Sequence, residues 1–135
     1  MIKTSRGCLW AVVLVVAAIA IVYLQDALLP SHAAGNLPEG ATEIQEFYAD
    51  YGIITGDFVR LLKARIPENQ VAEYARKVGA VDRAGDGDKG RYPTWSREAD
   101  WFKPRKPPLY YRVEPGYRLI VGWENGYVYY DACAW

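Results

Sequence analysis

Apolar and polar residues are distributed so unevenly that the chain divides into two parts. Residues 7–25 carry no charged side chain and consist mostly of Val, Ala, Ile and Leu. An α-helix rises about 1.5 Å per residue, so a run of this length extends roughly 28 Å, close to the ~30 Å hydrocarbon core of a bilayer. We therefore predict a transmembrane helix within residues 1–25.

The charges around this run predict its orientation. Lys3 and Arg6 precede it, and the next Lys or Arg along the chain is Arg60. Because basic residues are retained on the cytoplasmic side, we expect a single-pass membrane protein with a cytoplasmic N-terminus and a C-terminal domain outside the cytoplasm. Trp10 and Tyr23 lie near the ends of the run, where amphipathic aromatic side chains favour the membrane interface.

A cleaved secretory signal is the alternative interpretation of the same run. The small residues Ser31 and Ala33 stand where a signal peptidase requires them for cleavage before Ala34, and Pro30 can end the helix. Secretory apolar regions usually span about 7–15 residues, so the longer run favours an uncleaved anchor. Both interpretations place the domain outside the cytoplasm.

Residues 26–41 contain Pro and Gly breaks that predict a tether before the domain, residues 42–135. The domain then opens with Thr42 as an N-cap and Gln45 three residues later, the pattern of a capping box. Apolar residues from Ile44 to Tyr51 follow at helical spacing. This pattern predicts a short helix over 43–51.

The next two elements are separated by a proline. Residues 58–66 favour a strand, because Phe58, Leu62 and Ala64 share one parity. Pro67 ends this strand and can open a helix, since the first turn of a helix needs no N–H from it. The expected apolar face of the helix is Val71, Tyr74, Ala75 and Val78, with Gly79 as its C-cap.

The strongest local pattern is Asn125-Gly126, the preferred pair for a type I′ turn between two antiparallel strands. The turn joins Tyr117–Glu124 to Tyr127–Ala132 and fixes their register. Leu119, Val121 and Trp123 then lie opposite Ala132, Tyr130 and Val128 on one face. The other face carries Arg118, Ile120, Gly122 and Glu124 against Asp131, Tyr129 and Tyr127. We expect the first face to be core and the second to be mixed and aromatic.

The order of these elements predicts the fold class. Residues 109–114 are predicted to form a strand before the hairpin, and Pro115-Gly116 is predicted to form the turn between them. Together the segments indicate an α+β fold: an N-terminal transmembrane helix followed by a small antiparallel sheet of three to four strands, backed by one or two helices.

Residues 82–108 have the composition of a loop. Asp82, Asp86 and Asp88 lack the spacing of an EF-hand, so we expect a solvated segment rather than a calcium site. Residues 103–108 read Lys-Pro-Arg-Lys-Pro-Pro, which is typical of a stiff polyproline stretch. Because the loop also carries two tryptophans, we expect it to fold back onto the domain.

The domain lacks the residues of common catalytic and metal sites. Beyond residue 36 the chain has no His, and Ser96 is its single Ser, which excludes Ser–His and Cys–His nucleophile pairs within the chain. Cys133 alone does not make a zinc site. The net charge of +0 gives no nucleic-acid footprint. We expect no enzymatic activity, cofactor, metal or nucleic-acid partner.

A carboxylate-dependent enzyme acting on envelope glycans is the alternative function. Glu114, Glu124 and Asp131 would supply the acid–base pair that glycoside cleavage needs. The simpler interpretation is that they are surface charges at strand ends, since the sequence does not show their separation.

The C-terminal third is unusually aromatic. Residues 92–135 contain seven Tyr, four Trp and one Phe, with the basic residues 103–106 close by. Tyr and Trp are favoured at binding surfaces, although they are also ordinary strand residues. We take Trp95, Trp101, Arg118, Tyr127 and Tyr129 as candidate binding residues for a protein, peptide or glycan partner.

Two segments resemble short exported or membrane-anchored bacterial proteins of unknown function. One runs from Phe58 to Gly79 and contains Leu-Lys-Ala-Arg-Ile-Pro-Glu; the other comprises Tyr110-Tyr111 and the closing run Glu124–Trp135. The resemblance implies a bacterial envelope protein, here of the inner membrane with a periplasmic domain, and implies no activity. Such proteins are often lipid-anchored, whereas this chain lacks the lipoprotein cysteine. A toxin-neutralising immunity protein, also small, anchored and non-catalytic, is a further hypothesis.

Overall fold

The computed structural model describes residues 6–52, 54–84 and 94–135. The chain divides into two compact units, Met1–Ser31 and His32–Trp135. Asp86 and Asp88, considered above for calcium, lie outside the described residues.

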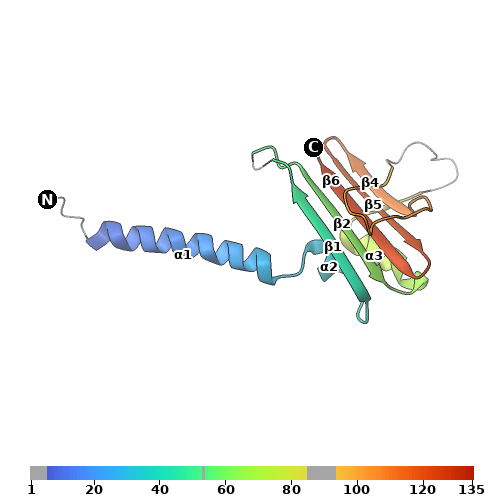
Figure 1. The fold of residues 1–135 in the computed structure, drawn as a ribbon, viewed down its shortest axis with the longest axis horizontal. Helices are drawn as coiled ribbons and strands as arrows, with labels where there is room; N and C mark the ends of the chain where they lie inside the picture. The colour runs from blue at the N-terminus through green and yellow to red at the C-terminus, as the bar shows by residue number, and fades with distance from the viewer. Residues whose placement is uncertain (1–5, 53, 85–93) are drawn as a thin grey trace. The chain divides into compact units, whose positions relative to one another are not determined.

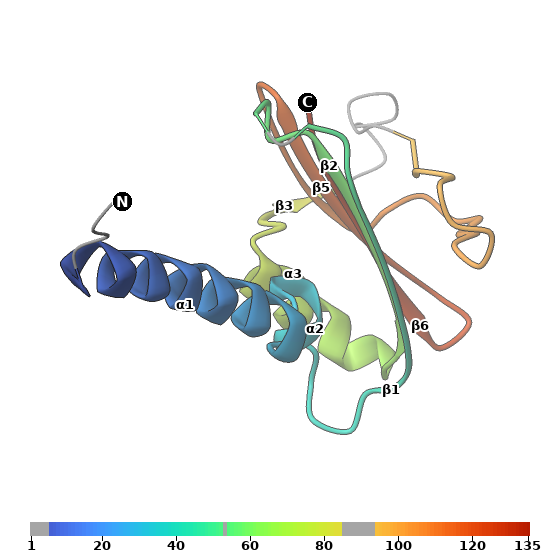
Figure 2. The ribbon, with the colours of Figure 1, turned by 60° about the vertical axis from the view of Figure 1, so that its left-hand side comes forward.

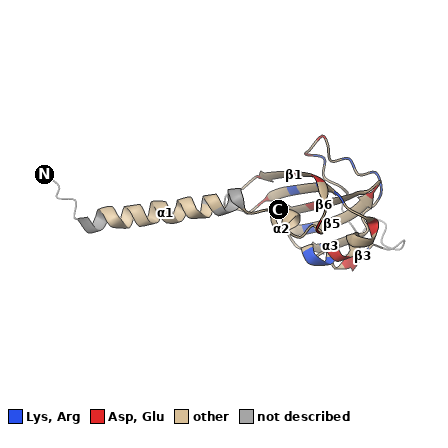
Figure 3. Cartoon of the chain, turned by 90° about the horizontal axis from the view of Figure 1, so that it is seen from below, with Lys and Arg blue, Asp and Glu red and all other residues tan. Residues whose placement is uncertain are grey.

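The first unit contains one helix, α1 (Arg6–Leu28). No Gly or Pro interrupts the sequence from Cys8 to Leu28, so the helix continues without a break. Its large apolar side chains are exposed where they are described, with Leu9 at 65% and Leu14 at 67%. Figure 3 shows no charge along the described middle of α1.

None of the helices that the structure describes combines the length and the apolar character needed to cross a membrane. The transmembrane helix expected within residues 1–25 therefore stays a prediction.

The second unit is built on a six-stranded sheet in which every pair of neighbouring strands is antiparallel, in the order β1-β2-β6-β5-β4-β3 (Figure 1). The strands are β1 (Thr42–Asp50), β2 (Phe58–Arg65), β3 (Asp82–Arg83), β4 (Tyr110–Glu114), β5 (Tyr117–Glu124) and β6 (Tyr127–Ala134). The short helices are α2 (His32–Gly35), η1 (Glu68–Gln70) and α3 (Val71–Val78). The α+β class is confirmed, and the expected three to four strands are too few.

Residues 42–50 form a strand, so the predicted helix over 43–51 is wrong. β1 pairs with β2 and places Phe47 opposite Leu61. Glu43 has a positive φ of 50°, and the register shifts between Thr42 and Gln45. This bulge interrupts the two-residue alternation of the strand. The remaining apolar spacing imitates that of a helix.

Residues 32–41 belong to the domain, so the predicted tether over 26–41 is too long. Ala33 of α2 is 0% exposed, and its carbonyl oxygen accepts a hydrogen bond of 3.0 Å from the Tyr74 hydroxyl. Leu37 and Ala41 pack against the same core. The folded unit therefore begins before residue 42.

One side of the sheet, here called the helix-covered face, packs against α2 and α3 (Figure 2). From α3 the predicted apolar residues are all buried, namely Val71, Tyr74, Ala75 and Val78. From the sheet the buried residues include Leu62, Ala64, Leu119, Val121, Val128, Tyr130 and Ala132. Gly79 ends α3 with a left-handed φ of 93°, which confirms the predicted C-cap.

The β5–β6 hairpin has the predicted register, with Trp123 opposite Val128 and Leu119 opposite Ala132. Asn125 and Gly126 both have positive φ, 54° and 89°, as a type I′ turn requires. The strand predicted over 58–66 is also confirmed as β2. The register of the hairpin depends on contacts between residues that are close in sequence, whereas β2 also pairs with the distant strand β6.

The opposite side of the sheet, the loop-covered face, lies beneath residues 94–108, here called the covering loop (Figure 2). The covering loop contains no helix or strand. Tyr129 on this face is 8% exposed and Ile120 is 0% exposed. The expectation of a loop folded back onto the domain is confirmed, and as a result this face of the hairpin is buried rather than open.

Candidate functional site

The covering loop packs onto the sheet through its own apolar side chains. Phe102 is 2% exposed and Ala99 is 7% exposed, and both join a second core cluster with residues of β2 and β6. The ring of Phe102 meets those of Trp95 and Tyr129 edge-to-face, at centroid distances of 5.8 and 5.4 Å. Each such aromatic pair contributes about 0.5–1.5 kcal/mol beyond burial. These contacts fix the loop in place.

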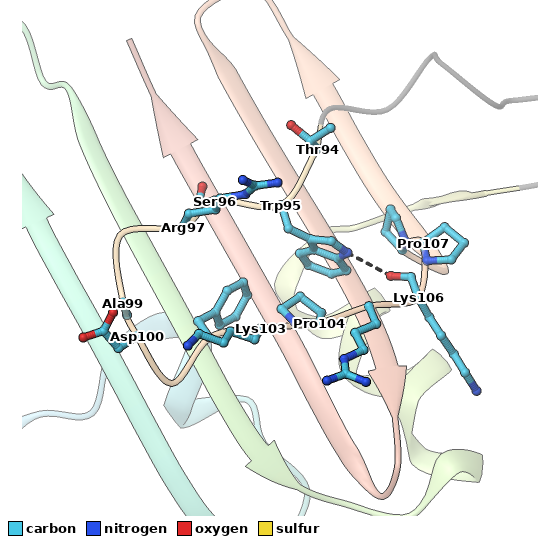
Figure 4. Close-up of a pocket in the computed structure, with 13 residues that line it drawn as sticks. Thr94, Trp95, Ser96, Arg97, Ala99, Asp100, Lys103, Pro104, Lys106 and Pro107 are labelled. Atoms are coloured by element: carbon cyan, nitrogen blue, oxygen red, sulfur yellow. Dashed lines mark hydrogen bonds between the residues drawn. The ribbon is translucent and has the colours of Figure 1, made fainter.

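Gly122 of β5 provides the space in which Trp95 approaches the sheet. A Cβ at this position would lie 2.8 Å from Trp95 Cζ2 and 3.6 Å from Pro108 Cα. The Trp95 indole N–H donates to the carbonyl oxygen of Lys106 at 2.9 Å (Figure 4). The ring of Trp95 therefore connects the sheet to the returning arm of the covering loop.

A buried polar cluster holds the start of the covering loop. The carboxylate of Asp131, 0% exposed, accepts hydrogen bonds from the Ser96 N–H at 2.7 Å and the Ser96 hydroxyl at 3.0 Å. Arg118 donates to Ser96 Oγ at 2.6 Å and lies 3.5 Å from Asp131 Oδ2. Cys133 Sγ lies 3.5 Å from Ser96 Oγ. The four side chains thus satisfy one another below the loop.

Burial controls the protonation of this cluster. Burial raises the pKa of the Asp131 carboxyl, while the hydrogen bonds from Ser96 and the charge of Arg118 act against that rise. Burial also raises the pKa of the Cys133 thiol. Because the thiolate is the nucleophilic form of cysteine, a raised pKa keeps Cys133 unreactive at neutral pH.

Glu124 holds the other arm of the covering loop. Its Oε2 accepts hydrogen bonds from the backbone N–H groups of Arg105, at 2.7 Å, and Lys106, at 3.2 Å. The bond from Arg105 contributes most to holding the pKa of the Glu124 carboxyl below its ordinary value. These bonds engage the backbone of Arg105 and Lys106, and the side chains of both residues are exposed.

A pocket of about 790 Å³ lies between the two arms of the covering loop (Figure 4). Its apolar lining comes from Trp95, Ala99, Phe102, Pro104, Pro107 and Pro108. Its cationic lining comes from Arg97, Lys103, Arg105 and Lys106, here called the pocket cations, and Asp100 adds one carboxylate to the lining. Ligand sites for small molecules and peptide side chains commonly occupy about 300–1,000 Å³, so the pocket has the size of a binding site.

The pocket cations differ from most other basic residues of the domain. Arg60, Arg65, Arg76, Arg112 and Arg118 each lie within 4.0 Å of a carboxylate oxygen. Among the described residues, none of the pocket cations has such a partner. The positive charge of the pocket is therefore not neutralised by an ion pair within this part of the chain.

The five residues predicted to bind a partner have different surroundings in the structure. Trp95 lines the pocket, whereas Trp101 is half-buried against Phe102, with ring centroids 5.9 Å apart. Tyr129 lies beneath the loop, and the side chain of Arg118 is 14% exposed within the polar cluster. The structure therefore brings Trp95 to the pocket and gives Tyr129 and Arg118 positions below it.

Tyr127 belongs to a separate cluster at the end of the sheet. Its hydroxyl donates to Glu43 and accepts a hydrogen bond from Arg65 at 2.6 Å. The ring lies 4.3 Å from Lys63 Nζ and 4.5 Å from the Arg65 guanidinium carbon. These contacts join β1, β2 and β6, so Tyr127 has partners on the adjacent strand β2 and on β1 beyond it.

The pocket cations are the residues that sequence reasoning left out of the site. The signal in the sequence is that three of the four cations lie close together within residues 103–106. What the sequence did not show is that Arg97 returns to the same pocket across the turn of the loop.

The carboxylates considered for acid–base chemistry are engaged separately. Glu114 Oε1 lies 2.6 Å from the Arg112 guanidinium, Glu124 holds the loop backbone, and Asp131 lies in the buried cluster. Each has structural partners of its own.

No family model, no curated protein and no solved structure matches this chain. The resemblance to exported bacterial proteins therefore stays a prediction.

Proposed function

We propose that this chain is a membrane-anchored, non-catalytic recognition module whose binding site is the pocket of the covering loop. The observation that carries the proposal is a set of four pocket cations around apolar walls, none of them ion-paired within the described residues, on a loop that is fixed at both arms. A site held in advance loses less conformational entropy when its partner binds.

Anchoring by α1 is supported by the uncharged sequence from Gly7 to Gln25 and by the exposed apolar side chains of its described part. A stretch of this kind requires an apolar environment. Ala33 favours an uncleaved anchor over a cleaved signal. Cleavage before Ala34 would remove a residue that is 0% exposed and accepts the Tyr74 hydroxyl bond.

A binding role fits the chemistry of the covering loop better than catalysis. The groups with nucleophilic or acid–base character near it, Ser96, Asp131 and Cys133, bond to one another and are buried. The pocket itself presents four cations, one carboxylate at Asp100, and apolar surface. Such a lining binds and orients a partner.

Site-specific photo-crosslinking in living cells tests the site. A photoreactive amino acid placed at Arg97 or Arg105 should give a discrete covalent adduct with a partner. The matched control is Arg76 of α3, a basic residue whose side chain is 69% exposed on the other side of the sheet. Equal adducts from all three positions, or none from the pocket positions, would contradict the proposal.

The anchor is tested independently of the pocket. A reporter that is active outside the cytoplasm should be active when fused after Trp135, and the protein should remain in the membrane after alkaline extraction. Mass spectrometry of the purified chain should find residues 1–33 retained. A mature chain that begins at Ala34 would instead establish a cleaved signal.

A further inference from the structure

We infer that the occupant of the pocket is an acidic segment of a partner protein, in which Asp or Glu residues stand next to apolar ones. The inference rests on the proposed binding role of the pocket and adds the class of partner. It follows from three observations: pocket cations without an ion pair among the described residues, the apolar walls between them and the scarcity of hydroxyl groups in the lining.

The pocket cations match carboxylates in charge and geometry. Arg97 and Arg105 carry planar guanidinium groups, which bind carboxylates through two parallel hydrogen bonds. The backbone of Arg105 and Lys106 is fixed by Glu124, so these two side chains project from a defined position. Like Arg97 and Lys103, both are exposed and lack an ion pair within the described residues. A partner that supplies carboxylates would complete the pairing that other arginines of the domain already have.

The apolar lining distinguishes an acidic peptide from an acidic glycan. A sugar surface is covered with hydroxyl groups, which lose hydrogen bonds to water unless the protein provides partners. The hydroxyl groups of the lining are those of Thr94 and Ser96, and the Ser96 hydroxyl already bonds Asp131 and Arg118. The Trp95 N–H is likewise engaged by Lys106. The pocket therefore favours apolar side chains beside carboxylates.

The acidic residues of the covering loop distinguish a peptide from an anionic membrane surface. Asp100 lines the pocket beside the four cations, and Glu98 is exposed on the same loop. A lipid surface responds to the summed charge of a basic patch, which these two acids reduce. A peptide that enters the pocket meets the individual cations at close range, where each forms a charge-assisted hydrogen bond.

Fluorescence anisotropy with the full chain in zwitterionic nanodiscs tests the inference. The probe is a labelled peptide of about ten residues that combines Glu, Asp and Leu, a length that spans a recognition groove. Its isostere replaces the acids with Gln and Asn. The variant is Arg105→Gln with Lys106→Gln, which keeps both backbone N–H groups. The matched control is Arg76→Gln with Lys77→Gln, an adjacent basic pair on α3.

The acidic peptide should bind, and the Arg105/Lys106 variant should weaken binding by about tenfold or more, as loss of charge-assisted contacts predicts. The Arg76/Lys77 control should change the affinity by less than about twofold, and added salt should weaken binding of the acidic peptide. Equal affinity for the isostere, or no effect of the Arg105/Lys106 variant, would overturn the inference. Unchanged melting temperatures would show that both variants are folded.

Two competitors identify the other possible occupants. One competitor is a vesicle that contains phosphatidylglycerol. If it displaces the peptide, with the same dependence on Arg105 and Lys106, the occupant is a lipid surface and not a peptide. The other competitor is an oligogalacturonate. If it displaces the labelled peptide more strongly than the unlabelled peptide does, the occupant is an acidic glycan. Either result overturns the peptide inference, and crosslinks from Arg97 and Arg105 in cells would show that the pocket is nevertheless a binding site.

Discussion

The two faces of the sheet are both covered, and the coverings differ in what fixes them. The helix-covered face is closed by α2 and α3, which contribute apolar side chains to the core. The loop-covered face is closed by a segment without regular structure. Among the described residues, the buried polar side chains Ser96 and Asp131 both lie on this second side.

The difference follows from where backbone groups find partners. A helix arrives with most of its backbone bonds made, so burial of an apolar stripe is enough to hold it. An irregular segment needs partners for its N–H groups, and Asp131 and Glu124 provide them for Ser96, Arg105 and Lys106. Directional bonds also position the segment, which a binding pocket requires.

Adjacent leucines of β2 give the most direct test and the largest expected effect. Leu61 and Leu62 are both 0% exposed and point to opposite faces. Leu62→Ala should lower the free energy of unfolding by about 2–5 kcal/mol. Leu61→Ala should lower it less, because the covering loop can move into the space more readily than a helix. Thermal unfolding measures both, and an equal or larger loss for Leu61→Ala would show that the loop is as rigid a cover as α3.

Removing the buried carboxylate should have the next largest effect. Asp131→Ala removes the acceptor of the Ser96 N–H and the carboxylate beside Arg118, at a cost of about 1–3 kcal/mol. Hydrogen exchange should accelerate at the amides of residues 94–108 before those of α3. Uniform acceleration over both faces would mean that the polar cluster stabilises the whole sheet rather than the loop.

Gly122→Ala should displace Trp95 from the sheet. The added methyl would lie 2.8 Å from the indole, and overpacking of this kind costs about 1–3 kcal/mol, with one methyl at the lower end. In a Trp95→Ala background the same substitution should cost much less, because the clashing ring is absent. Chemical denaturation of the four proteins completes this cycle, and additive losses would rule out the contact as the cause.

The smallest effect separates the two carboxylates by pH. The pKa of Glu124 is lowered from 4.5, so its contribution to stability is present above that value and is lost as pH falls through the lowered pKa. Asp131 behaves oppositely: its pKa is raised from 3.8, so ionisation as pH rises through the raised pKa disfavours the folded state.

The difference in melting temperature between wild type and Glu124→Gln should therefore shrink in acid. For Asp131→Asn, which cannot ionise, the melting temperature relative to wild type should increase as pH rises above 3.8. A Glu124→Gln difference independent of pH would contradict its clamping role.

Much of the fold was predictable where the controlling contacts are local. Asn125-Gly126 determines the register of its own hairpin, and Pro67 and Gly79 bound the helical segment between them. β1 was not predictable in this way, because its strand conformation comes from pairing with β2 and its alternation is broken at Glu43. The local capping pattern at Thr42 was outweighed by that pairing.

The candidate site was less predictable because it depends on distant contacts. Ser96 and Asp131 are 35 residues apart, and nothing in either neighbourhood indicates the other. Trp95 and Gly122 form a comparable pair. In the sequence Gly122 is only a residue that disfavours a strand, and its role becomes clear when the structure places the Trp95 ring against it. The aromatic composition of the C-terminal third drew attention to this region, and several of its rings pack the loop onto the sheet.

The outer strands of the sheet have a consequence for behaviour at high concentration. β1 and β3 are the two edges, and an unpaired edge is a template for intermolecular strand addition and aggregation. β3 has two residues, which is too short for stable addition of another strand. β1 is longer and carries Glu43 and Glu46, and the bulge at Glu43 bends its first part. Short length protects one edge, and the backbone distortion at Glu43 protects the first part of the other. Protection of both edges allows many copies to be crowded together without merging their sheets.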